Sequence, residues 1–201
     1  MKKFFIGMMA AAAIFFQANV AFATPTVEIP EEVYKWIQST PRGNYWFNYQ
    51  IMGYKILDDD TLDLNILEVP ALITYDNIQI EDVVQKRRWR GQSTRGYNNL
   101  IGRADYLEFN FAEGTVQIVR RADLDHTFTE LDSETLSEPI KLSELAEQDI
   151  SCKFYRQILK WARENNEWII QRSRGKLSKR DSKISPKNYP IFKLKWDVDK
   201  K

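Results

Sequence analysis

The 201-residue chain contains one cysteine, Cys152, and one histidine, His126. A disulfide bond needs two thiols, so this chain cannot be held together by internal disulfides. Structural zinc sites take most of their ligands from cysteine and histidine, and the composition therefore excludes a zinc site of that kind. We expect no metal and no cofactor, and we assign no catalytic residue.

An excess of charge of one sign is also missing, because 29 lysines and arginines stand against 28 aspartates and glutamates, a net charge of +1. Apolar residues make up 43% of the chain. This balance is typical of a folded protein and argues against a disordered tail. Beyond residue 23 no apolar run approaches the roughly 20 residues that a transmembrane helix needs, so we expect no membrane-spanning segment in the mature chain.

The N-terminal residues have the three parts of a secretory signal peptide. Two lysines directly after Met1 precede an apolar run over residues 4–16, which is too short to span a membrane. The tripeptide Ala21-Phe22-Ala23 then matches the A-x-A pattern of a cleavage site. We therefore expect residues 1–23 to be removed and the mature chain, starting at Thr24, to be periplasmic or secreted.

The mature chain has the length of one domain with one hydrophobic core. No Gly/Ser-rich or Pro-rich linker interrupts residues 24–171. Residues 172–201 differ in composition, because they include 11 basic and three acidic residues. We therefore predict an α+β domain over residues 24–171 and a basic, partly mobile C-terminal extension over residues 172–201.

Two segments have the apolar spacing of helices. Residues 30–39 start on a proline, which suits the first position of a helix, and place Val33, Trp36 and Ile37 on one face. Residues 149–171 form the longer candidate, because large apolar residues repeat there at helical spacing.

Alternating polar and apolar residues predict several strands. The clearest cases are the aromatic segment 45–57, the segment Leu62–Ile66, and a hairpin with strands at residues 106–111 and 115–121. Pro70 cannot donate to a strand ladder, so we expect a break or a sheet edge there. Residues 78–90 fit a helix or a strand, and we favour a strand that ends in a loop. The order of elements predicts an α+β fold in which an antiparallel sheet of about four to six strands packs against two main helices.

The most suggestive binding feature is a run of basic residues that contains one tryptophan. Residues 83–103 include six basic residues and no acidic residue. Arginine forms paired hydrogen bonds with phosphate and carboxylate groups, and tryptophan can stack on a ring. The candidate binding residues are Lys86, Arg87, Arg88, Trp89, Arg90, Arg95 and Arg103.

This basic segment permits two interpretations. In the first, it contacts an anionic partner, and an exported protein can meet anionic polysaccharide, lipid headgroups or another envelope protein. Extracellular DNA carries the same charge, but nucleic acid is not the partner we expect. In the second, the segment lies against residues 123–149, which include nine acidic residues and one lysine.

A second motif points to catalysis. The residues Asp123-Leu124-Asp125-His126-Thr127 resemble the D-x-D-x-T signature of haloacid-dehalogenase-type phosphatases. The resemblance implies that Asp123 attacks phosphorus, that Asp125 transfers protons and that magnesium binds both carboxylates. In that family the motif follows a buried, continuously apolar strand, whereas a glutamine and two arginines interrupt the preceding segment here. We therefore favour a polar strand end that continues into an acidic loop.

The aromatic segment 45–54 is a third candidate, either as core or as a platform for carbohydrate or peptide, and we expect core. Together with the predicted export, these features favour a bacterial, non-enzymatic binding or surface-associated module that acts through its basic segment. The alternative function is a small metal-assisted hydrolase that uses Asp123 and Asp125.

Overall fold

The computed structural model describes residues 27–136 and 138–199, and the predicted signal peptide over residues 1–23 lies outside them. Eight strands in the described part form one antiparallel sheet. The strands are β1 (Tyr34–Thr40), β2 (Gly43–Asn48), β3 (Gly53–Ile56), β4 (Leu62–Tyr75), β5 (Leu100–Asn110), β6 (Thr115–Asp125), β7 (Glu130–Thr135) and β8 (Ile140–Lys141). The α-helices are α1 (Asn77–Trp89), α2 (Ile150–Glu164), α3 (Asn166–Arg172) and α4 (Pro190–Lys193). The single α+β domain and its antiparallel sheet are confirmed, but the sheet has more strands than expected.

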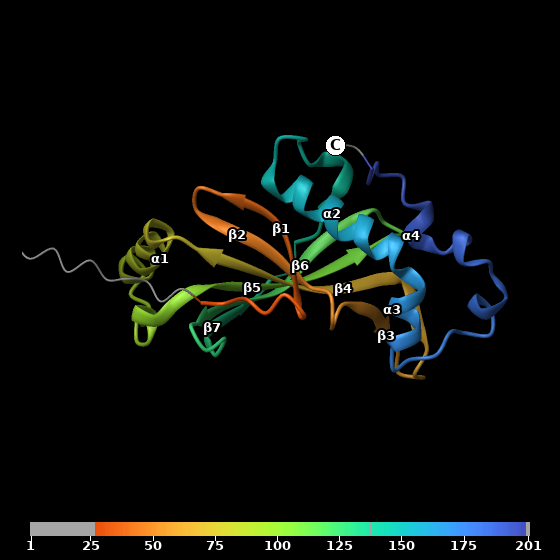
Figure 1. The fold of residues 1–201 in the computed structure, drawn as a ribbon, viewed down its shortest axis with the longest axis horizontal. Coiled ribbons are helices and arrows are strands. Elements are labelled where there is room, and N and C mark those ends of the chain that lie inside the picture. The colour runs from red at the N-terminus through yellow and green to blue at the C-terminus, as the bar shows by residue number, and fades with distance from the viewer. Residues whose placement is uncertain (1–26, 137, 200–201) are drawn as a thin grey trace, which may run out of the picture.

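The long strand β4 organises the sheet. The strand order is β1-β2-β4-β5-β6-β7, with β3 beside the first half of β4 and β8 beside the start of β6 (Figure 1). Pairing with β3 ends at Glu68 and pairing with β2 begins at Ala71. Pro70 lies between these two ladders and pairs only with Tyr106 in β5. On this side of β4 no strand needs an N–H donor at position 70, so a proline fits there. The expected break or sheet edge at Pro70 is therefore wrong, because β4 continues through it.

The predicted strand over residues 45–57 is two strands, which explains part of the difference in strand number. β2 ends at Asn48, and β3 begins at Gly53. The Asn48 side chain accepts hydrogen bonds from the backbone N–H groups of Gln50 and Ile51, both at 3.1 Å. An asparagine that bonds its own backbone in this way favours a turn, so the chain reverses here.

Helices α2, α3 and α4 pack on one face of the sheet (Figure 1). Their shared core includes Phe47 and Phe109 from the strands and Ile158 from α2, all with 0% exposure. The predicted helix over residues 149–171 is divided at Asn165, whose side-chain amide donates to the carbonyl oxygen of Trp161 at 2.8 Å. None of the helices in the described part of the chain has the length and apolar character required to cross a lipid bilayer.

The predicted helix over residues 30–39 is wrong, because Tyr34–Thr40 is the edge strand β1. The pairing of β1 with β2 shifts between Trp36 and Gln38, which marks a bulge. A bulge adds one residue to a strand and interrupts its alternation. The apolar residues around the bulge therefore fall at a helix-like spacing.

The strand favoured for residues 78–90 is also wrong, because these residues lie almost entirely in α1. The helix is capped by Asp76, whose side chain accepts a hydrogen bond from the backbone N–H of Gln79 at 2.7 Å. An aspartate directly before a helical segment is a start signal. Here it outweighs the alternation of the two isoleucines that follow.

The predicted hairpin is confirmed and extends beyond its predicted ends. β5 and β6 pair from Asn110 opposite Thr115 to Leu100 opposite Asp125. Gly114 closes the connection with a φ of 67°, a left-handed conformation that glycine adopts without steric strain.

The C-terminal segment, predicted as an extension, supplies part of the core. Its buried side chains are Tyr189, Ile191, Trp196 and Val198. They join the same hydrophobic cluster as α2 and the sheet. The partial mobility of residues 172–201 stays a prediction.

Candidate functional site

Helix α1 carries most of the predicted binding residues and stands apart from the core. None of its 13 residues is buried. It lies at the end of the sheet that is distant from α3 and α4 (Figure 1). A helix this short is marginally stable by itself in water, so its contacts with the rest of the domain must hold it in place.

Arg87 supplies such an attachment. Its side chain is only 13% exposed, and its Nη2 lies 2.7 Å from Asp132 Oδ2 while its Nη1 lies 3.8 Å from Asp123 Oδ2. Its Nε donates to the Ser93 carbonyl oxygen, and its guanidinium carbon lies 4.3 Å from the centre of the Tyr97 ring. The Tyr97 hydroxyl donates to Asp123 at 2.7 Å. Arg87 therefore joins α1 to β6 and β7 and is already occupied by intramolecular partners.

The neighbours of Arg87 are exposed, and we call Lys86, Arg88, Trp89 and Arg90 the α1 tip. Trp89 has 81% of its surface exposed. Lys86 forms an ion pair with Asp82 at 2.6 Å, one helical turn earlier, and both side chains remain about half exposed. Within the described residues, the side chains of Arg88 and Arg90 have no hydrogen bond or ion pair. Arg95, in the loop after α1, is also exposed. Its backbone N–H donates to the Ser93 hydroxyl oxygen, whereas its side chain has no hydrogen bond or ion pair among the described residues.

Arg103 does not belong to the α1 tip. Its Nη2 lies 3.1 Å from Asp105 Oδ2, and Arg121 Nε lies 2.7 Å from Asp105 Oδ1. Asp105 is only 4% exposed, so the two guanidinium groups compensate the charge of a buried carboxylate. Sequence reasoning missed this network, because only the register that places Arg121 opposite Asp105 reveals it.

The two interpretations of the basic segment thus apply to different residues. Arg87 contacts Asp123 and Asp132, which both belong to the acidic segment 123–149. Arg103 pairs with Asp105, outside that segment. The α1 tip remains available to a partner.

The two aspartates of the phosphatase-like motif make separate sets of contacts. Asp125 Oδ1 accepts from the N–H and hydroxyl of Thr127 and from the N–H of Thr129, in the turn after β6. The hydrogen bond from Thr127 is the main cause that lowers the pKa of Asp125, whereas burial raises the pKa of Asp123. No group of three His, Cys, Asp or Glu side chains in the described part of the chain is placed to hold a metal ion.

The aromatic segment 45–54 contributes both to the core and to the surface. Phe47 and Tyr54 are buried, as expected for core. Trp46 and Tyr49 line a cleft of about 400 Å³. The other lining residues of this cleft are Glu31, Tyr34, Lys35, Trp36 and Trp161.

No protein-family model, curated protein or solved structure matches the chain. Its function must therefore be inferred from the placement of its own side chains. Among the residues that the sequence singled out, the α1 tip combines exposure, positive charge and an aromatic ring.

Proposed function

We propose that the mature chain is an exported binding module and that the α1 tip contacts an anionic polysaccharide of the cell envelope. The observation that carries this proposal is a contrast between neighbours on one helix. Arg87 is tied to the sheet by two carboxylates, whereas Arg88, Trp89 and Arg90 are exposed. A helix without a buried residue, attached to the sheet through Arg87, is suited to presenting its neighbours to a partner.

The chemistry of the α1 tip suits an acidic sugar polymer. Guanidinium groups form paired hydrogen bonds with carboxylate and phosphate groups. The indole ring offers a large, flat apolar surface against which a sugar ring can pack. Because Arg87 anchors the helix before binding, less conformational freedom is lost when a partner arrives.

The proposal includes export, which rests on the sequence of residues 1–23. The exported protein should begin at Thr24. Mass spectrometry of the periplasmic and secreted fractions tests this, and a cytosolic protein that retains Met1 would contradict it.

Binding to alginate, a polymer of sugar acids, tests the ligand class with the mature chain, residues 24–201. Affinity electrophoresis should show retardation by alginate and none by neutral dextran, and retardation should weaken as salt screens the charges. The double variant R88A/R90A should lose about tenfold or more in affinity. The variant W89A should also bind less tightly, but with an unchanged salt dependence.

The matched control is K153A/K160A, which removes two exposed charges from α2. This variant should bind alginate as the wild type does. An equal loss in both double variants would show that only net charge matters and would overturn the proposal. Tighter binding to vesicles of anionic lipid than to alginate would also overturn it, in favour of a membrane surface.

A further inference from the structure

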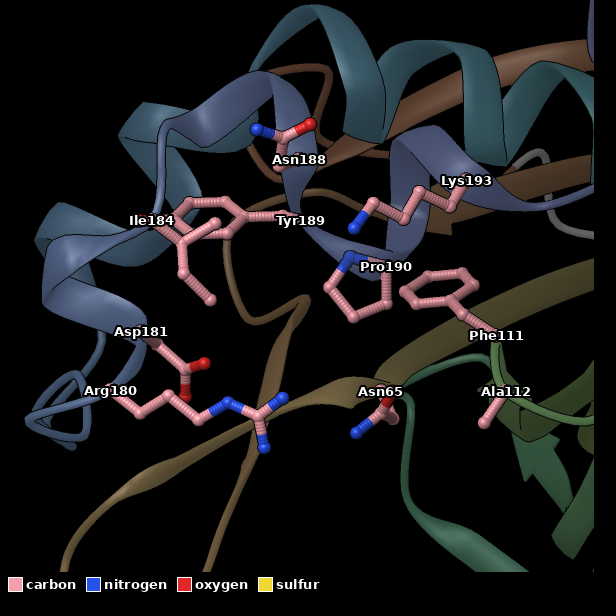
Figure 2. A pocket seen from close by; sticks show the side chains of 10 residues that line it. All are labelled: Asn65, Phe111, Ala112, Arg180, Asp181, Ile184, Asn188, Tyr189, Pro190 and Lys193. Atoms are coloured by element: carbon pink, nitrogen blue, oxygen red, sulfur yellow. The ribbon is translucent and has the colours of Figure 1, made fainter.

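A second cleft, of about 350 Å³, lies between the C-terminal segment and one end of the sheet (Figure 2). One wall comes from β4 and from the connection between β5 and β6, and the other comes from residues 180–193. The lining residues are Asn65, Phe111, Ala112, Arg180, Asp181, Ile184, Asn188, Tyr189, Pro190 and Lys193. The volume is near the lower end of the range for small-molecule sites, so it fits a ligand of about one sugar ring.

The apolar part of this cleft is built on the core. Phe111 and Tyr189 are 6% and 5% exposed, and both belong to the main hydrophobic cluster. Pro190 begins α4 and lies beside Phe111 in Figure 2. Side chains held by core packing give the cleft a preformed shape, which lowers the entropy lost on binding.

The polar part of the cleft contains two cations without partners. Within the described residues, the side chains of Arg180 and Lys193 form no ion pair and no hydrogen bond. Figure 2 shows the Arg180 side chain extending toward Asn65, while the Lys193 side chain extends over Pro190. The two cations therefore approach the cleft from different parts of its wall.

One acidic residue, Asp181, also lines the cleft. Its Oδ2 accepts a hydrogen bond from the Ser178 hydroxyl at 2.6 Å, and the Ser178 hydroxyl oxygen accepts from the Asp181 N–H. The lining thus carries two positive charges and one negative charge. This balance favours a ligand with one anionic group.

We propose that this cleft binds a hexose-sized ligand that bears one carboxylate or phosphate group. Arg180 and Lys193 attract the anionic group from two sides of the cleft, since both carry positive charge and neither has an internal partner. The side-chain amides of Asn65 and Asn188 bond hydroxyl groups of the ring. The apolar surface of Phe111 and Pro190 packs against the ring itself. The site is independent of the α1 tip, which lies at the other end of the sheet.

Titration of the ¹⁵N-labelled mature chain with D-glucuronate, D-glucose 6-phosphate, D-glucose and acetate tests the proposal. At least one of the two acidic sugars should shift the backbone signals of Ala112, Asn188 and Lys193, and it should bind about tenfold more tightly than glucose or acetate. A preference for glucuronate identifies a carboxylate ligand, and a preference for glucose 6-phosphate identifies a phosphate ligand. Equal binding of acetate and glucuronate would show an unspecific cation pair and would overturn the proposal, as would the absence of shifts with both acidic sugars.

Three variants test the residue assignment. R180A and K193A should each weaken binding of the preferred sugar by about tenfold, whereas D181N should tighten it, since it removes the opposing charge. The matched control K187A removes an exposed positive charge from the same segment but not from the cleft wall. Equal weakening by K187A would overturn the assignment. In R88A/R90A, the acidic sugars should shift the signals of Ala112, Asn188 and Lys193 as in the wild type. Failure of the α1 tip proposal and failure of the cleft proposal therefore remain distinguishable.

Discussion

The guanidinium carbon of Arg87 lies 4.3 Å from the centre of the Tyr97 ring, and this stacked pair connects α1 to the sheet. The Tyr97 hydroxyl continues the connection to Asp123 in β6. Arg87 also bonds Asp132 in β7. Arg87 thus attaches the exposed end of α1 to β6 and β7, although its neighbour Arg88 in the same basic run makes no such contact.

Replacing Arg87 with alanine should therefore loosen α1. The change removes two ion pairs, the hydrogen bond to the Ser93 carbonyl oxygen and a cation–π contact, and we expect a loss of about 1–3 kcal/mol in the free energy of unfolding. Urea denaturation measures this loss, and hydrogen exchange should show faster exchange in α1. The matched variant R88A removes an exposed, unpaired side chain and should change stability by less than about 0.5 kcal/mol. Equal effects of the two changes would contradict the anchoring role.

The carboxyls of Asp123 and Asp132 should titrate on opposite sides of their ordinary pKa of 3.8. Burial raises the pKa of Asp123, whereas the hydrogen bond from Arg87 lowers the pKa of Asp132. The contribution of Asp132 to stability is present above pH 3.8 and is lost as pH falls through its lower folded-state pKa. The contribution of Asp123 is present below pH 3.8 and is lost as pH rises through its higher folded-state pKa.

Carboxyl-detected NMR titration measures both pKa values directly. In unfolding experiments over acidic pH, the stability advantage of wild type over D132N should shrink as pH falls below 3.8. The stability of D123N relative to wild type should instead increase as pH rises above 3.8. A pH dependence of the same sign for both variants would disagree with the structure.

The C-terminal segment should contribute strongly to stability. Ile191 is 0% exposed, whereas its neighbour Phe192 is 39% exposed. Replacement of Ile191 with alanine removes buried methyl groups and should destabilise the domain by about 2–5 kcal/mol. F192A should change stability by about 0.5 kcal/mol in denaturant unfolding. A small effect of I191A would show that the segment is peripheral to the core.

Gly102 allows β4 and β5 to approach closely. A Cβ atom on this residue would lie 2.1 Å from the Ile73 carbonyl oxygen and 2.8 Å from the Thr74 Cα. Both atoms belong to the backbone of a central strand, so G102A should destabilise the domain by about 2–3 kcal/mol. The control is G53A, where the nearest atom is 4.0 Å from the added Cβ, and it should change stability by less than about 1 kcal/mol. Similar thermal stability of the two variants would contradict this packing.

Local patterns predicted the elements in which most residues keep one period, although the register of the β5–β6 hairpin shifts between Tyr106 and Leu107. The hairpin of β5 and β6 follows from alternating residues around Gly114, and α2 follows from apolar residues at helical spacing. The prediction failed at β1, where the bulge after Trp36 imitates a helical pattern. It also failed at α1, where Ile80, Val83 and Val84 have helical spacing but no residue is fully buried, so the apolar face is weak.

For the candidate sites, too, the sequence identifies features made of neighbouring residues but not contacts between residues that are distant in the chain. The sequence identifies the basic run around Trp89, because its residues are consecutive. It cannot show that Arg87 turns inward, because Asp123 and Asp132 reach it only through the folding of β6 and β7. The cleft beside Lys193 could not be predicted from the sequence, because Asn65 and Lys193 are far apart in the chain and line the same cleft only in the folded domain.

The buried position of Ile191 and Trp196 has a consequence for biogenesis. A nascent polypeptide lacks these parts of its interior until this segment has been synthesised, so the native packing cannot be completed before then.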